Sequence, residues 1–163
     1  IMSIKKIITG LALSMLLSSV VAVAADFSKG LDAYNLGDFK TALAEWTPLA
    51  EQRNVSAQYN LGQMHRRGEG VPKNLKAAAK WYTLAAEQGH APAQGNLGVM
   101  YQYGEGVLTD TKRAYMWYNL ASYNGNEKAS KNKDKIAKDM TSAQINKAQD
   151  MSSRCLNSGY TDC

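Results

Sequence analysis

Apolar and small residues recur at helical spacing through most of the chain. Ala57, Leu61 and Met64 stand at i, i+4 and i+7, which places them on one face of a helix. A second stripe with the same spacing consists of Ala78, Trp81, Tyr82 and Ala85. The pattern therefore predicts two consecutive amphipathic helices, and nowhere does the chain show a strand pattern of any length.

Residues that start and end helices lie between these stripes. Gly68 follows the first stripe, where a glycine can take the left-handed conformation that closes a helix. Asn74 is placed to cap the N-terminus of the second helix, which we expect to stop at Gly89. Pro92 suits the first turn of the helix after that.

The same arrangement occurs twice. Residues 57–89 align with residues 93–125 at an offset of 36, and 17 of the 33 aligned positions are identical. About two identities would be expected by chance at average composition. A repeat of this length, made of two helices, predicts stacked helix pairs that share one continuous core.

Shorter helix pairs are expected on both sides of the repeats. Residues 26–56 predict helices over Phe27–Leu36 and Phe39–Arg53, separated by Gly37 and Asp38. After residue 125, a lysine-rich helix precedes a second one that opens at Thr141 with a capping-box pattern. We interpret residues 126–163 as two helices and a tail that cap the end of the stack.

A family resemblance follows from the repeated runs. AQYNLGQMHRRGEGVPKNLKAAAKWYTLAAEQG and AQGNLGVMYQYGEGVLTDTKRAYMWYNLASYNG both resemble the Sel1-like repeat, a subclass of the tetratricopeptide family. The resemblance implies an all-α, right-handed α-solenoid of antiparallel helix pairs. Within it, we expect a tetratricopeptide-like pair at 26–56, Sel1-like repeats at 57–92 and 93–125, and the capping helices at 126–163.

The first 25 residues have the pattern of a secretory signal peptide. Lys5 and Lys6 precede an apolar stretch that ends in small residues, and cleavage is expected after Ala24 or Ala25. An uncleaved anchor helix is the alternative. We expect a bacterial periplasmic or secreted monomer whose mature chain has no transmembrane segment and meets no nucleic acid.

Composition and charge add little to this picture. Of the 163 residues, 45% are apolar and 20% charged, as in an ordinary globular protein. Without the leader, 17 basic and 14 acidic residues leave a net charge of +3, which is weak support for an anionic partner. Five lysines at 128, 131, 133, 135 and 138 could bind an anionic surface or could simply keep the end of the stack solvated.

No residue pattern points to catalysis or to a metal site. The Gly68-Glu69-Gly70 run lacks the strand and the lysine of a phosphate-binding loop, so loop geometry explains it better. Glu69 and Glu105 are expected to be solvated loop charges or helix caps. His65 and His90 are too few for a metal site. We therefore predict no catalytic residues, cofactor or metal.

The aromatic and cysteine residues have structural interpretations. The two Trp-Tyr pairs, at 81–82 and 117–118, are predicted to pack between helices, although an exposed aromatic binding stripe is the alternative. An exported setting permits a disulfide between Cys155 and Cys163, against free thiols or an intermolecular bridge.

Stacking leaves the first helix of each pair on a concave surface. Asn60 and Asn96 are identical between the repeats but are not needed for the buried stripe, and an Asn amide can pair with both groups of a peptide backbone. Hydrogen bonding between adjacent helices is the alternative. The predicted partner-binding residues are Tyr59, Asn60, Gln63, Arg67, Asn96, Val99 and Tyr103.

Three classes of function follow from these observations. The favoured one is a non-enzymatic scaffold that binds a protein or peptide partner in the cell envelope, as the family resemblance also implies. A binder of glycans or small ligands is the second. The third, a hydrolase of cell wall or β-lactams, rests on activity attributed to cysteine-rich relatives, and this sequence shows no nucleophile motif for it.

Overall fold

The computed structural model describes residues 25–163, and the predicted leader lies outside this part. Residues 25–163 contain eight α-helices and no β-strand. In chain order the helices are α1 (Phe27–Asn35), α2 (Phe39–Glu51), α3 (Val55–Arg67), α4 (Leu75–Ala86), α5 (Ala91–Tyr103), α6 (Thr111–Tyr123), α7 (Glu127–Ala137) and α8 (Ser142–Asn157). The all-helical prediction is confirmed.

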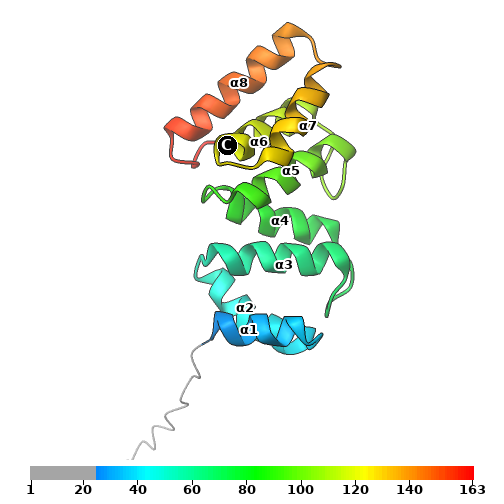
Figure 1. The fold of residues 1–163 in the computed structure, drawn as a ribbon, viewed down its shortest axis with the longest axis vertical. Coiled ribbons are helices and arrows are strands. Elements are labelled where there is room, and N and C mark those ends of the chain that lie inside the picture. The colour runs from blue at the N-terminus through cyan, green and yellow to red at the C-terminus, as the bar shows by residue number, and fades with distance from the viewer. Residues whose placement is uncertain (1–24) are drawn as a thin grey trace, which may run out of the picture.

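The helices stack in the order of the sequence. Each helix from α1 to α6 packs against the next one, and Figure 1 shows the stack rising from α1 at one end to α7 and α8 at the other. The pairs α1–α2, α3–α4 and α5–α6 are the units of an α-solenoid. Odd-numbered helices are the first helices of their units, and α7 continues their row. We call the surface that they form the first-helix face.

Capping residues recur every 36 residues, as the repeat predicts. The second helices α2, α4 and α6 are capped by the side chains of Asp38, Asn74 and Asp110. The helices α3, α5 and α7 are capped in the same way by Asn54, His90 and Asn126. The cap at His90 was not predicted. Helix α4 ends at Ala86, earlier than the predicted stop at Gly89, which takes its positive φ of 80° within the following turn.

A glycine on each first helix lets a buried aromatic ring approach its backbone. A Cβ placed on Gly62 would lie 2.6 Å from the ring of Tyr82, and Gly98 faces Tyr118 in the same way. Gly30 faces Trp46 in the first unit. The three rings are almost completely buried, so each unit is held together by one close helix–helix contact.

Buried glutamines join one unit to the next. The side chain of Gln58 donates to the carbonyl of Ala50 in α2 over 2.9 Å, and Gln94 donates to Ala86 in α4 over 3.1 Å. Each side-chain oxygen also accepts a hydrogen bond, from Gln88 and from Asn124 respectively. Both amides are therefore satisfied although both side chains are buried.

The loops after α3 and α5 reach back to the preceding unit. Gly70 packs against Phe39, where a Cβ would lie 2.7 Å from the phenylalanine side chain. Glu69 accepts a 2.8 Å hydrogen bond from Tyr34, and Glu105 accepts a 3.1 Å one from Arg66. The expectation that these glutamates are solvated charges or caps is wrong, because each bonds to a side chain on the preceding first helix.

The predicted aromatic core is confirmed with one difference. Tyr82, Trp117 and Tyr118 are buried, whereas Trp81 is half-buried at the edge of the core around α2 and α3. A continuous exposed aromatic stripe is therefore excluded for these positions.

The C-terminal helices close the stack separately. Both α7 and α8 pack against α6, and they have almost no contact with each other. Ile136 of α7 and Ala148 of α8 bury their side chains in the same cluster as Tyr118. Cys155 and Cys163 form the expected pair, with Cα atoms 4.6 Å apart and sulfurs at bonding distance.

Candidate functional site

Two hollows lie side by side on the first-helix face. The lower hollow, about 190 Å³ in volume, lies between α1 and α3 and is lined by Leu31, Tyr34, Asn35, Trp46, Asn60, Gln63 and Arg67. The upper hollow, about 200 Å³, lies over α5 between α3 and α7 and is lined by Tyr59, Pro92, Gly95, Asn96, Val99, Asn126, Lys128, Ala129 and Asn132. Six of the seven predicted binding residues line one hollow or the other. Tyr103 lines neither and is 63% exposed.

The charge of the lower hollow is compensated by Glu69, which lies in the loop that follows α3. Arg67 donates to the hydroxyl of Tyr34 over 2.9 Å, and its guanidinium lies 3.7 Å from the carboxylate of Glu69. The Tyr34 hydroxyl in turn donates to Glu69. Burial, followed by the hydrogen bond to Glu69, raises the pKa of Tyr34, so the hydroxyl stays protonated and remains a donor. The lower hollow is therefore a neutral site with an aromatic floor.

Gln63 positions the wall between the two hollows. Its amide nitrogen donates to the hydroxyl of Tyr59 over 3.1 Å, and its oxygen accepts from the hydroxyl of Tyr82 over 2.8 Å. Burial raises the pKa of Tyr82, which keeps this donor protonated. Because both ends of the amide are occupied, Gln63 orients Tyr59 rather than offering free groups to a partner.

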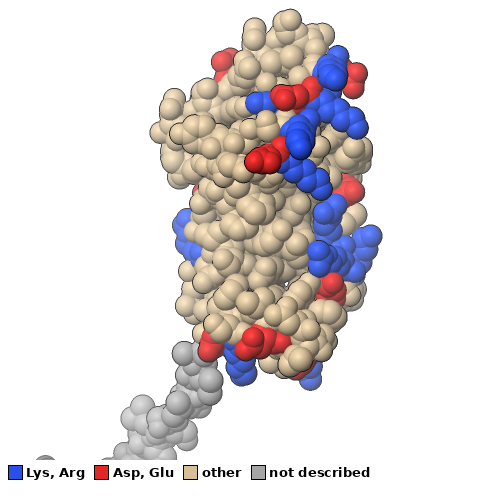
Figure 2. Space-filling view, viewed as in Figure 1, with Lys and Arg blue, Asp and Glu red and all other residues tan. Residues whose placement is uncertain are grey.

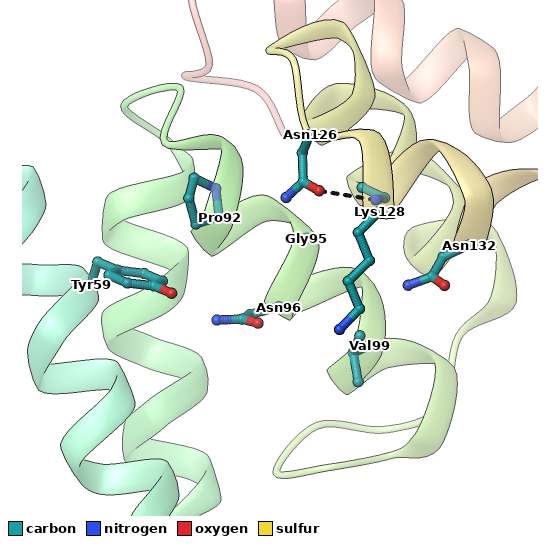
Figure 3. Close-up of a pocket in the computed structure, with 9 residues that line it drawn as sticks. Tyr59, Pro92, Gly95, Asn96, Val99, Asn126, Lys128 and Asn132 are labelled. Carbon is teal, nitrogen blue, oxygen red and sulfur yellow. Dashed lines mark hydrogen bonds between the residues drawn. The ribbon is translucent and has the colours of Figure 1, made fainter.

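The upper hollow is assembled at helix N-termini. Asn126 caps α7 by accepting from Ala129 over 3.0 Å, and its nitrogen donates to the carbonyl of Ala91 over 3.3 Å, which ties α7 to α5. His90 caps α5 through Nδ1, and its ring packs against Tyr59 with the ring centres 4.8 Å apart. Figure 3 shows the Lys128 side chain reaching from α7 over α5, toward Asn96 and Val99.

The two predicted asparagines keep their amides free. Both Asn60 and Asn96 are half-buried, and neither side chain makes a hydrogen bond to another residue of 25–163. The alternative in which these amides link adjacent helices has no support in the described part of the chain. Their amides are instead positioned to contact whatever enters the hollows.

The repeats match a known family model. Residues 55–90 and 91–126 each match the Sel1 repeat, and these two segments coincide with α3–α4 and α5–α6. The chain contains two Sel1 repeats. The repeats begin two residues earlier than the boundaries predicted from the sequence, because the family unit opens at the first residue of each first helix.

Two solved structures are similar to this chain. One is a protective antigen of uropathogenic Escherichia coli strains that displays an SLR fold, with a TM-score of 0.74, 31% identity and 80% of this chain covered. The other is a Sel1 repeat protein from Oxalobacter formigenes, with a TM-score of 0.64, 33% identity and 66% of this chain covered. The chain spans only 30% and 44% of these two proteins. No curated protein matches it.

The remaining sequence predictions concern metal ligands, membrane spans and the histidine His65. Residues 25–163 contain no group of three His, Cys, Asp or Glu side chains that could hold a metal ion. Every helix in that part is too short or too polar to cross a bilayer. His65 is half-buried in the last turn of α3, where its Nδ1 has no partner and burial lowers its pKa. The imidazole therefore packs as a neutral ring.

Sequence reasoning missed the contributions of α1 and α7 to the hollows. The connection between α1 and α2 spans residues 36–38, whereas the Sel1 units use seven residues, so a fixed offset of 36 misaligns α1. For α7 the signal was present, because Asn132 stands 36 residues after Asn96 and Asn126 stands 36 after His90. Extending the repeat past residue 125 would have identified this wall of the upper hollow.

Proposed function

We propose that this protein is a non-enzymatic scaffold that binds a segment of a partner protein along its first-helix face. The observation that carries the proposal is the pair of half-buried, hydrogen-bond-free amides of Asn60 and Asn96, one in each hollow. An extended peptide has unpaired N–H and C=O groups that such amides satisfy. Two such sites on neighbouring units suit a chain that runs across both.

Several features support a site of action outside the cytoplasm. The first 25 residues have the pattern of a cleaved secretory leader. The pairing of Cys155 with Cys163 fits an oxidising compartment such as the bacterial periplasm. We therefore place the scaffold in the cell envelope.

The proposal is tested by capture from envelope extracts of the native bacterium. The immobilised protein is compared with the double variant Asn60→Ala/Asn96→Ala and with a matched control, Asn146→Ala/Asn157→Ala, on the exposed side of α8. We expect the same proteins to be retained by the native chain and by the control but lost by the first double variant, with all three melting alike. The proposal would be contradicted if the first double variant retained the same proteins as the native chain. It would also be contradicted if that variant lost them only because it had unfolded.

A further inference from the structure

The upper hollow holds a positive charge that its own lining does not neutralise. Lys128 makes no ion pair with any residue of 25–163, and no Asp or Glu is among the described residues that line the hollow. Figure 2 shows that Lys and Arg gather along one edge of the molecule, from the level of α7 down to that of α3 and α4. Lys128 is itself exposed, so its attraction for an anion is that of a surface charge and weakens as salt is added. The hollow therefore favours a carboxylate.

The position of the ammonium indicates which carboxylate it meets. Figure 3 shows the Lys128 side chain ending by Val99, on the α7 side of Asn96. A peptide backbone paired with Asn96 would pass the ammonium at its side. A carboxylate on a side chain next to that backbone segment reaches Lys128, whereas a terminal carboxylate would require the chain to end at α5.

The lower hollow selects a different side chain. Its cation, Arg67, is already engaged by Tyr34 and Glu69, and its lining includes Trp46 and Leu31. Leu31 is 41% exposed, so apolar surface is available there. Transfer of an apolar side chain from water onto this surface is favourable, while a second carboxylate would meet no free cation.

Resting on the proposed function, we propose that the partner is an extended peptide segment that carries an acidic and an apolar side chain. It places an aspartate or glutamate side chain against Lys128 in the upper hollow and an apolar side chain in the lower hollow. Asn60 and Asn96 pair with the main chain between them.

The test uses a display library of random ten-residue segments that are flanked on both sides by a fixed linker, so that no segment has a free carboxyl terminus. Segments are selected on the purified protein, and the tightest binder is made as a labelled peptide in its acidic form and with the acid replaced by its amide. Affinities of both forms are measured by fluorescence anisotropy for the native protein, for Lys128→Gln and for the control Lys131→Gln. Lys131 is exposed on the same helix but does not line the hollow.

We expect the selected segments to share an acidic residue and an apolar one. Replacing the acid by its amide should weaken binding to the native protein and to Lys131→Gln by about two- to fivefold, the size of an exposed ion pair. For Lys128→Gln the two peptides should bind equally. Equal binding of both peptides to the native protein would overturn the inference, as would an acid effect that survives in Lys128→Gln.

The same experiment separates this inference from the proposed function. If selected segments lose affinity for Asn60→Ala/Asn96→Ala but show no dependence on an acid, the face binds peptides and only the charge assignment is wrong. If no segment is enriched, or if none depends on the two asparagines, the proposed function fails as well.

Discussion

The two hollows lie on the same face but differ in position and chemistry: the lower one lies between α1 and α3, and the upper one over α5, mostly against α7. In the lower hollow Arg67 is held by Tyr34 and Glu69, and the floor is aromatic. In the upper hollow Lys128 has no partner among the described residues, and amides replace the aromatic floor. The side chains that line each hollow, rather than the shared repeat, therefore decide what it binds.

Several of the positions at which the two repeats differ lie on this face. Inside the stack the glycine–aromatic contacts and the glutamine bonds recur 36 residues apart with the same partners. At the surface, Tyr59, Gln63 and Arg67 are replaced in the next unit by Gly95, Val99 and Tyr103. Changes to the shared interior should consequently alter stability in both units alike, and changes to the surface should alter binding.

The largest effect is expected from the floor of the lower hollow. Trp46 is only 1% exposed, so Trp46→Ala removes a fully packed ring and should lower the free energy of unfolding by about 3–5 kcal/mol. Chemical denaturation monitored by circular dichroism measures this loss. Tyr123→Ala, at a position that is 73% exposed, is the control and should change stability little. A loss below about 1 kcal/mol for Trp46→Ala would show that the lower hollow does not rest on this ring.

The next largest effect is expected from a substitution on α3, which contributes residues to both hollows. Alanine usually stabilises a helix relative to glycine by up to about 1 kcal/mol. At Gly62 the added Cβ would meet the ring of Tyr82 at 2.6 Å, so Gly62→Ala should instead cost about 2–3 kcal/mol. In the background Tyr82→Leu the same change should cost much less, because the ring is gone. Equal costs in the two backgrounds would refute the close contact.

The glutamine that joins the units beneath the upper hollow should contribute somewhat less. Gln94→Leu removes the bond to the carbonyl of Ala86 and one of the bonds of the Asn124 amide, which still pairs with Tyr160, at a cost of about 1–2 kcal/mol. Gln58→Leu removes the equivalent bonds beside the lower hollow and should cost about the same. If the denaturation curves of the two variants differed widely, the contacts of Gln58 and Gln94 between units would not be equivalent.

The smallest effect concerns His90, which caps α5 and packs against Tyr59. His90 accepts a hydrogen bond through Nδ1 and must be neutral to do so, and burial lowers its pKa below the usual value. The unfolded chain therefore takes up a proton first as the pH falls below about 6.5, and stability declines toward the lowered pKa. Part of this decline, about 1 kcal/mol or less, should disappear in His90→Asn, which supplies the cap found at Asn54 and Asn126. An unchanged pH profile between pH 7 and 5 would rule out the role of His90.

The sequence predicted the fold well because its local signals agree with the packing. Apolar stripes, capping residues and the period of 36 all follow from contacts within a helix or between adjacent helices. His90 was missed as a cap because histidine rarely serves there, although Asn54 and Asn126 lie 36 residues to either side. The helix end before Gly89 was placed too late because the glycine ends a turn and not the helix itself.

The candidate site was predicted less completely because the walls of each hollow come from two or three units. Asn60 and Asn96 were identified from repeated identity, whereas Lys128 was one of five lysines in residues 128–138, and nothing local distinguished it from the other four. Glu69 and Glu105 were misassigned because their partners lie 35 and 39 residues away in sequence. A pattern of neighbouring residues cannot predict contacts between residues this far apart.

The most direct measurement of the central claim follows the side-chain amides of Asn60 and Asn96 by NMR. Their NH2 signals are assigned from single Asn→Asp variants and followed while the selected acidic peptide is titrated into isotope-labelled protein. The account predicts that both signals shift in parallel with saturation, while the side-chain amide of Asn157, on the exposed side of α8, does not. Saturable binding that leaves both signals unmoved and instead shifts residues of α2, α4 or α6 would contradict it.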